Sequence, residues 1–166
     1  MITYYTTQDE YKAICKVKFW KVLLARMARL LIAAAIIIFA DIIIRKHPFK
    51  GGLFAFGFIS AFGFVAQLII VSVNEIASPM GKFRKLKQEK VAHELDVNSG
   101  CFSFKDGVLN ESIVIEEIKS AVVKGEFFVV SGEGKDQKGK TRKRIIVIPI
   151  NETTKETIQE IAKKSA

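Results

Sequence analysis

Residues 51–73, GGLFAFGFISAFGFVAQLIIVSV, decide the fold of this chain, because the run carries no charge and is long enough to cross a bilayer as one helix. A membrane span needs about 20 mainly apolar residues. A second apolar run, residues 22–44, precedes it and is interrupted only by Arg26, Arg29 and Asp41. Residues 45–50, which include Pro48, predict a short loop between the two runs. Residues 22–73 are therefore expected to form a two-helix transmembrane hairpin.

The charge of the chain is concentrated beside these runs. The net charge is +9, and residues 1–73 hold nine Lys and Arg against Asp9, Glu10 and Asp41. Basic residues that flank spans record insertion topology and attract anionic headgroups, so nucleic acid is not expected as a partner. Cys15 and Cys101 are too few for a disulfide framework or a metal cage.

The start of the chain predicts a strand followed by an interfacial helix, residues 1–21. Thr7 and Glu10 have the spacing of a capping box. The acidic pair at 9 and 10 is not typical of the basic start of a cleaved signal peptide, so the first span is expected to remain. Basic residues outnumber those of the 45–50 loop both before the first span and after the second. This bias predicts that both termini are cytoplasmic.

Polar and small residues inside the spans suggest how the helices pair. Arg29 and Gln67 lie at similar depths from the same end, which predicts a hydrogen bond between them. Gly57 and Ala61, one helical turn apart, would let another helix approach closely. That helix is either the first span, through its alanines at 33–35, or a span of another protomer.

The pattern changes after residue 73. Ser78, Pro79 and Gly81 are expected to break the helix and open a basic juxtamembrane linker, residues 74–90. Residues 91–166 then alternate apolar and polar side chains, with turns at 98–100 and at Asp106-Gly107, as in half-buried strands. Further strands are expected at 112–115, 118–124, 127–130 and 145–150.

A helix is expected to close the chain, with Thr153 and Glu156 as a second capping box. Its apolar face, Ile158, Ile161 and Ala162, should cover the sheet. The predicted fold class is membrane α + β: a two-helix transmembrane hairpin, then a small antiparallel β sheet or open barrel with a C-terminal helix.

Four further stretches are informative: residues 4–11, FSFKDGVL at 102–109, IEEIKSAVV at 115–123, and IVIPI at 146–150 before the last helix. Together with the two spans, they resemble the YcxB-like family of bacterial membrane proteins. The resemblance implies a multi-pass protein of the bacterial inner membrane, with a cytoplasmic domain similar to pleckstrin-homology (PH) domains.

Residues 134–141, GKDQKGKT, match the phosphate-binding loop of P-loop nucleotidases. That loop needs a helix beginning at Lys140-Thr141, so that N–H groups converge on phosphate. Residues 142–150 are instead β-branched and predict a strand. A nucleotide-binding enzyme therefore ranks as the third functional hypothesis, after a binding module and a transport or channel component. His47 lies in the predicted loop between the spans, and His93 lies on the inward face of a predicted strand. Neither has neighbours at ligand spacing, so each is expected to be a packed or exposed histidine. No catalytic residue, cofactor or metal is predicted.

Two basic segments could touch anionic lipid or an acidic partner, although each could also be merely solvated. Their candidate residues are Lys82, Arg84, Lys85, Lys87, Lys138, Lys140, Arg142 and Arg144. The sequence favours a non-enzymatic binding or scaffold module held at the inner membrane, with membrane lipid and either a protein partner or further copies of the chain as partners. An oligomeric transport or channel component is the alternative.

Overall fold

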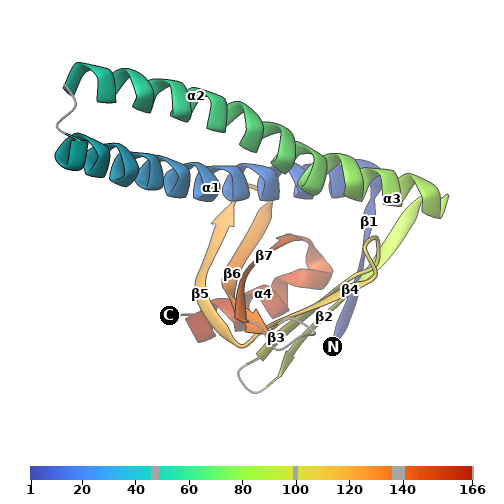
Figure 1. Ribbon diagram of the computed structural model, residues 1–166. Helices are drawn as coiled ribbons and strands as arrows, with labels where there is room; N and C mark the ends of the chain where they lie inside the picture. The colour runs from blue at the N-terminus through green and yellow to red at the C-terminus, as the bar shows by residue number, and fades with distance from the viewer. Residues whose placement is uncertain (46–48, 99–100, 136–140, 166) are drawn as a thin grey trace. The chain divides into compact units, whose positions relative to one another are not determined.

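The computed structural model describes the backbone of residues 1–45, 49–98, 101–135 and 141–165, and it divides into two compact units (Figure 1). The first unit holds Met1–Lys18 and Ser78–Ala166, and the second holds Phe19–Ala77. The sequence predicts a separate segment at residues 1–21. In the structure the first strand and the first turns of the first helix belong with the β-rich part of the chain.

The second unit contains most of one long helix and the whole of another. Helix α1 covers Gln8–Arg45 and helix α2 covers Phe49–Ser72. Both are long and apolar enough to cross a membrane, as judged by length and composition. The predicted cap of α1 is confirmed, because the Thr7 N–H donates to Glu10 Oε2 at 2.7 Å and the Glu10 N–H donates to Thr7 Oγ1 at 3.4 Å.

The two helices run antiparallel. Ala34 of α1, one of the predicted alanines, is buried, but the small residues of α2 at the contact are not the predicted Gly57 and Ala61. A Cβ on Gly52 would meet Ile42, and one on Gly63 would meet Leu30, whereas one on Gly57 would meet nothing. Ala61 is also exposed. Phe19, Leu23 and Val71 close the end of the pair that lies away from the 46–48 connection. Gly57 and Ala61 therefore lie off the contact between α1 and α2.

The expected helix break at Ser78-Pro79 is wrong. Helix α2 leads into a π-helical turn, η1 (Val73–Ala77), and directly into helix α3 (Ser78–Leu86). Proline has no N–H, and its ring collides with the carbonyl four residues earlier in an α-helix. The wider π turn lies just before Pro79, where it relieves that conflict and lets the helix continue. The helix ends at Leu86, and Lys87, which follows it, has a φ of 52°.

The first sheet confirms the predicted alternation and the turn at Asp106-Gly107, whereas residues 99–100 of the other predicted turn lie outside the described residues. It has the order β1-β2-β3-β4, antiparallel throughout. Its strands are β1 (Ile2–Thr7), β2 (Lys90–Asn98), β3 (Cys101–Asp106) and β4 (Glu111–Ile115). The side chains of Val91, His93 and Leu95 are buried as the alternation predicts, and Asp106-Gly107 begins the β3–β4 turn. Strand β1 lies at the edge of this sheet and pairs with β2.

The second sheet has three antiparallel strands in the order β5-β6-β7. They are β5 (Glu117–Lys124), β6 (Phe127–Lys135) and β7 (Thr141–Pro149). One face joins the main core, while Val129 and Val147 on the other face pack against Ile14 of α1. This sheet is therefore covered on both sides within its own unit.

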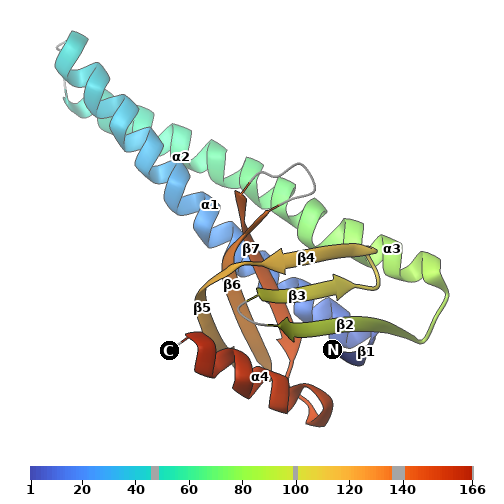
Figure 2. The same ribbon diagram turned by 90° about the horizontal axis from the view of Figure 1, so that it is seen from below.

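Helix α4 (Glu152–Ser165) packs on β1 and β5 and closes the core (Figure 2). Ile158 and Ile161 are buried among core side chains of both sheets, as predicted. The predicted cap is wrong by two residues, because the capping pair is Asn151 and Thr154. The Thr154 N–H donates to Asn151 Oδ1 and the Asn151 N–H donates to Thr154 Oγ1, both at 3.0 Å.

Candidate functional site

A buried polar cluster around His93 lies inside the β-rich unit. We call Thr6, Tyr11, His93 and Asp106 the His93 cluster. Thr6 comes from β1, Tyr11 from the second turn of α1, His93 from β2 and Asp106 from the end of β3. His93 and Thr6 are each 1% exposed, and Asp106 is 8% exposed. Polar groups buried this deeply are costly unless they are hydrogen-bonded.

The hydrogen bonds of the His93 ring define its tautomer. The Gly107 N–H donates to His93 Nδ1 at 3.3 Å, so Nδ1 acts as an acceptor and carries no proton. In the neutral ring the proton then lies on Nε2, which donates to Thr6 Oγ1 at 2.8 Å. Both ring nitrogens are thus satisfied without a charge.

Asp106 joins the same cluster to the β3–β4 turn and to α1. Its Oδ1 accepts the Val108 N–H at 2.8 Å and the Leu109 N–H at 3.2 Å, which fixes the turn. Its Oδ2 accepts the Tyr11 hydroxyl at 3.0 Å. One carboxylate therefore links the loop after β3 to the beginning of the long helix.

Aromatic rings enclose the imidazole. The ring centroids of Tyr4, Tyr11 and Phe104 lie 5.2, 5.8 and 6.0 Å from that of His93, each in a stacked arrangement. Tyr11 also contacts Phe83 of α3, with centroids 5.5 Å apart. The cluster thus ties β1, α1, α3 and the first sheet together.

Burial sets the ionisation of this cluster. It lowers the pKa of His93, and the nearby Asp106 carboxylate, 3.6 Å from Nδ1, opposes that shift only in part. Burial, with a further contribution from Asp106, raises the pKa of the Tyr4 hydroxyl. At neutral pH the imidazole and this phenol are therefore uncharged.

Thr6, His93 and Asp106 supply a hydroxyl, an imidazole and a carboxylate, which are the three groups of a catalytic triad. A working base must accept the hydroxyl proton at the nitrogen that faces the hydroxyl. Here Nε2 already carries a proton and donates a hydrogen bond to Thr6, and Nδ1 accepts a hydrogen bond from the Gly107 N–H. The hydrogen bonds of the cluster join β1 to β2 and α1 to the end of β3, and Thr6 is 1% exposed.

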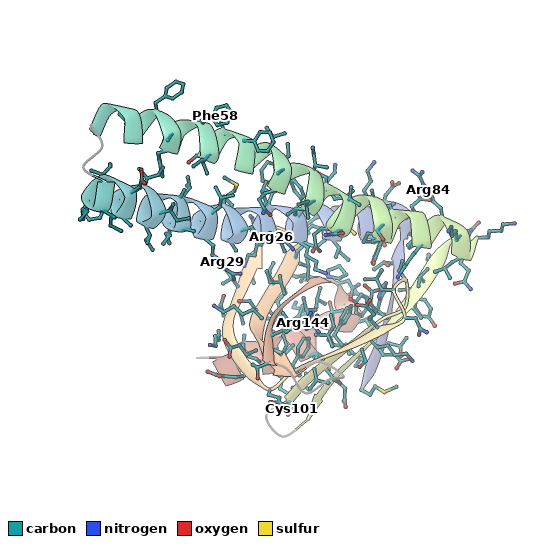
Figure 3. All side chains as sticks on the ribbon, in the orientation of Figure 1. Arg26, Arg29, Phe58, Arg84, Cys101 and Arg144 are labelled. Atoms are coloured by element: carbon teal, nitrogen blue, oxygen red, sulfur yellow. The ribbon has the colours of Figure 1, made fainter. Side chains whose placement is uncertain are left out.

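The predicted basic candidates lie on separate elements. Lys82, Arg84, Lys85 and Lys87 are exposed on α3 and at its end, while Pro79, Met80 and Phe83 of the same helix are buried. Arg142 is exposed and Arg144 half-buried on β7. Figure 3 marks Arg84 and Arg144 on these two elements. Lys138 and Lys140 lie outside the described residues, as does His47.

Two structural features explain the P-loop-like sequence. Strands β6 and β7 flank residues 136–140 as an antiparallel pair, and β7 begins at Thr141, where a phosphate-binding loop would begin a helix. The predicted strand is confirmed. Gly134, the first glycine of the motif, is needed for packing, because a Cβ there would collide with the Val114 carbonyl oxygen.

The polar pair between the long helices differs from the predicted one. Gln67 Oε1 accepts a long hydrogen bond, 3.5 Å, from Arg26 Nη1, whereas the prediction named Arg29. Arg29 is exposed and lies one turn further along α1 (Figure 3). The helices cross so that Gln67 lies opposite residue 26. The prediction was three residues off because it matched positions by their distance from the ends of the spans.

The chain was compared with protein-family models, curated proteins and solved structures. No protein-family model, curated protein or solved structure gives a significant match to this chain. The YcxB-like resemblance therefore stays a prediction.

Sequence reasoning placed His93 on an inward face and missed its partners. Thr6 and Asp106 are 87 and 13 residues away in the chain, and Tyr11 lies in the predicted interfacial helix. The Asp106-Gly107 pair was a visible signal, but only for a turn. Within the described residues no group of three or more His, Cys, Asp or Glu side chains could hold a metal ion.

Proposed function

We propose that this chain is a two-span inner-membrane protein that presents a PH-like domain at the cytoplasmic leaflet as a binding module. The observation that carries the proposal is the apolar surface of the two long helices. Phe54, Phe58 and Ile44 are 79%, 67% and 78% exposed, and the apolar windows of both helices are almost wholly unburied. An apolar surface of this extent needs lipid or protein to cover it.

The orientation rests on the flanking charges. Basic residues are enriched before the first span and after the second, and such residues stay on the cytoplasmic side during insertion. Strand β1 supports the placement of both ends of the hairpin on one side, because it precedes the first span and yet pairs with β2, which follows the second span. Both ends of the hairpin must then be on one side of the membrane.

The PH-like assignment is supported by the layout of the domain. A four-stranded and a three-stranded antiparallel sheet share one core, and a C-terminal helix packs on it. In such a domain the strands and the helix build the core, and exposed side chains are the ones that can bind a partner. A binding module accords with the His93 cluster, whose polar atoms are engaged in holding elements together.

Fractionation of cells that express the full chain tests membrane integration. We expect the protein to sediment with membranes, to resist alkaline carbonate and to be released by detergent. A chain that carbonate releases would refute the spans, and with them the proposal.

In-cell photo-crosslinking tests the binding role. A photoreactive side chain at exposed positions of the domain, such as Val122, Lys124 and Lys155, should give a discrete and reproducible adduct from at least one of them. The same side chain at buried Ile161 is the control and should give none. Absence of any adduct from all exposed positions would contradict a binding module.

A further inference from the structure

Two helical segments of the β-rich unit contact each other, and both carry basic residues on their outward faces. The start of α1 and helix α3 meet through Tyr11 and Phe83, whose ring centroids are 5.5 Å apart. Their buried side chains face the unit, namely Tyr11, Ile14 and Cys15 on α1 and Pro79, Met80 and Phe83 on α3. The outward faces are basic.

The exposed basic residues come from both helices. They are Lys12, Lys16, Lys82, Arg84, Lys85 and Lys87, which we call the two-helix basic surface. The ion pairs formed by the described residues use other cations, Lys105 and Lys119 among them. Asp9 and Glu10 are the acidic residues of this stretch of α1, and Glu10 is engaged in the helix cap. The surface thus carries an excess of positive charge.

Chain continuity keeps these residues close to the apolar helices. Lys12 and Lys16 come two turns and one turn before Phe19, within one uninterrupted helix. Lys82 and Lys85 follow the α2 span within a second helix that is continuous from Gly51 to Leu86. Because α1 and α2 are antiparallel, both basic segments leave the hairpin at the same end. Exposed Trp20 at that end is a residue type favoured at headgroup depth.

We infer that the two-helix basic surface binds the phosphate headgroups of anionic phospholipids in the cytoplasmic leaflet. The inference rests on the proposed function, since it requires the hairpin to be inserted. It adds Lys12 and Lys16 of α1 to the α3 residues and makes lipid, not protein, the partner of this surface. Clustered Lys and Arg beside a span attract anionic lipid, each strengthening binding by about fivefold.

The test titrates full-length protein in neutral detergent with phosphatidylglycerol and follows its thermal stability, with phosphatidylcholine as the neutral-headgroup control. Phosphatidylglycerol should raise the melting temperature, and phosphatidylcholine should not. The doubles Lys12→Gln/Lys16→Gln and Lys82→Gln/Lys85→Gln should each weaken the apparent affinity by at least about tenfold. Added salt should weaken binding to the wild type.

A matched double, Lys124→Gln/Lys155→Gln, removes two exposed charges from β5 and α4. It should bind phosphatidylglycerol as the wild type does. The inference is overturned if this control loses as much affinity as the other doubles, if neither test double loses affinity, or if the wild type does not respond to phosphatidylglycerol. Carbonate resistance of every variant reports insertion separately, so a failure of headgroup binding is distinguishable from a failure of the spans.

Discussion

His93 is a buried, neutral histidine whose two ring nitrogens are hydrogen-bonded, and we expect the domain to lose stability in acid for this reason. The folded pKa lies below the ordinary value because burial disfavours the charged ring. The unfolded chain binds a proton near pH 6.5 and the folded chain does not. Stability is therefore fully present above about pH 6.5 and falls, by up to about 1.4 kcal/mol per pH unit, as pH decreases toward the folded pKa.

Unfolding of the detergent-solubilised protein between pH 8 and 5 checks this expectation. His93→Gln should flatten the pH dependence, since its amide cannot titrate. His47→Gln removes the chain's other histidine and should leave the wild-type slope. An unchanged slope in His93→Gln would show that another group causes the acid sensitivity.

Single residues also show where sequence reasoning stops. The burial of His93 followed from its place in an alternating strand. Its hydrogen bonds to Thr6 and Gly107 did not, because they depend on the pairing of β1 with β2 across two intervening helices. For the same reason Gly134 looked like part of a phosphate loop, although its lack of a Cβ serves the close approach of β4 to β6.

Among the elements, helix α4 has two sequence patterns that could each cap its N-terminus. Thr153-x-x-Glu156 and Asn151-x-x-Thr154 both have capping spacing, and the structure uses the second. Asn151→Ala should lower the free energy of unfolding by about 1 kcal/mol. Thr153→Ala, at an exposed position, should change it little. Equal losses in chemical denaturation of the two variants would contradict the observed cap.

The contact between α1 and α2 gives a second matched pair. A side chain at Gly63 must displace Leu30, whereas a side chain at Gly57 meets nothing. Gly63→Leu should destabilise the protein in detergent by about 1–3 kcal/mol through overpacking. Gly57→Leu should be neutral or slightly stabilising, because leucine favours a helix more than glycine does. A larger loss at Gly57 would mean that the exposed face of α2 packs on another helix.

Periodicity predicted most elements and missed what depends on helix geometry in space. The strands, both hairpin helices and the closing helix follow from alternation and helical spacing. The continuation of α2 through Pro79 did not, because a π turn has no sequence signature of its own. The Arg26–Gln67 contact was missed because it depends on the crossing register of α1 and α2.

For the whole molecule, we propose that the two apolar helices cross a membrane and that both termini and the β-rich unit lie in the cytoplasm. The chain supplies its own probe, since Cys101 on β3 is exposed and Cys15 on α1 is buried. A Cys15→Ser variant would leave Cys101 as the sole thiol. Its labelling then reports the side of the membrane on which the sheet lies.

The most direct test treats cells that produce Cys15→Ser with a membrane-impermeant maleimide, before and after the inner membrane is permeabilised. We expect Cys101 to be labelled only after permeabilisation, in protein that fractionates with membranes. Labelling of Cys101 in intact cells would place the domain outside and contradict the account.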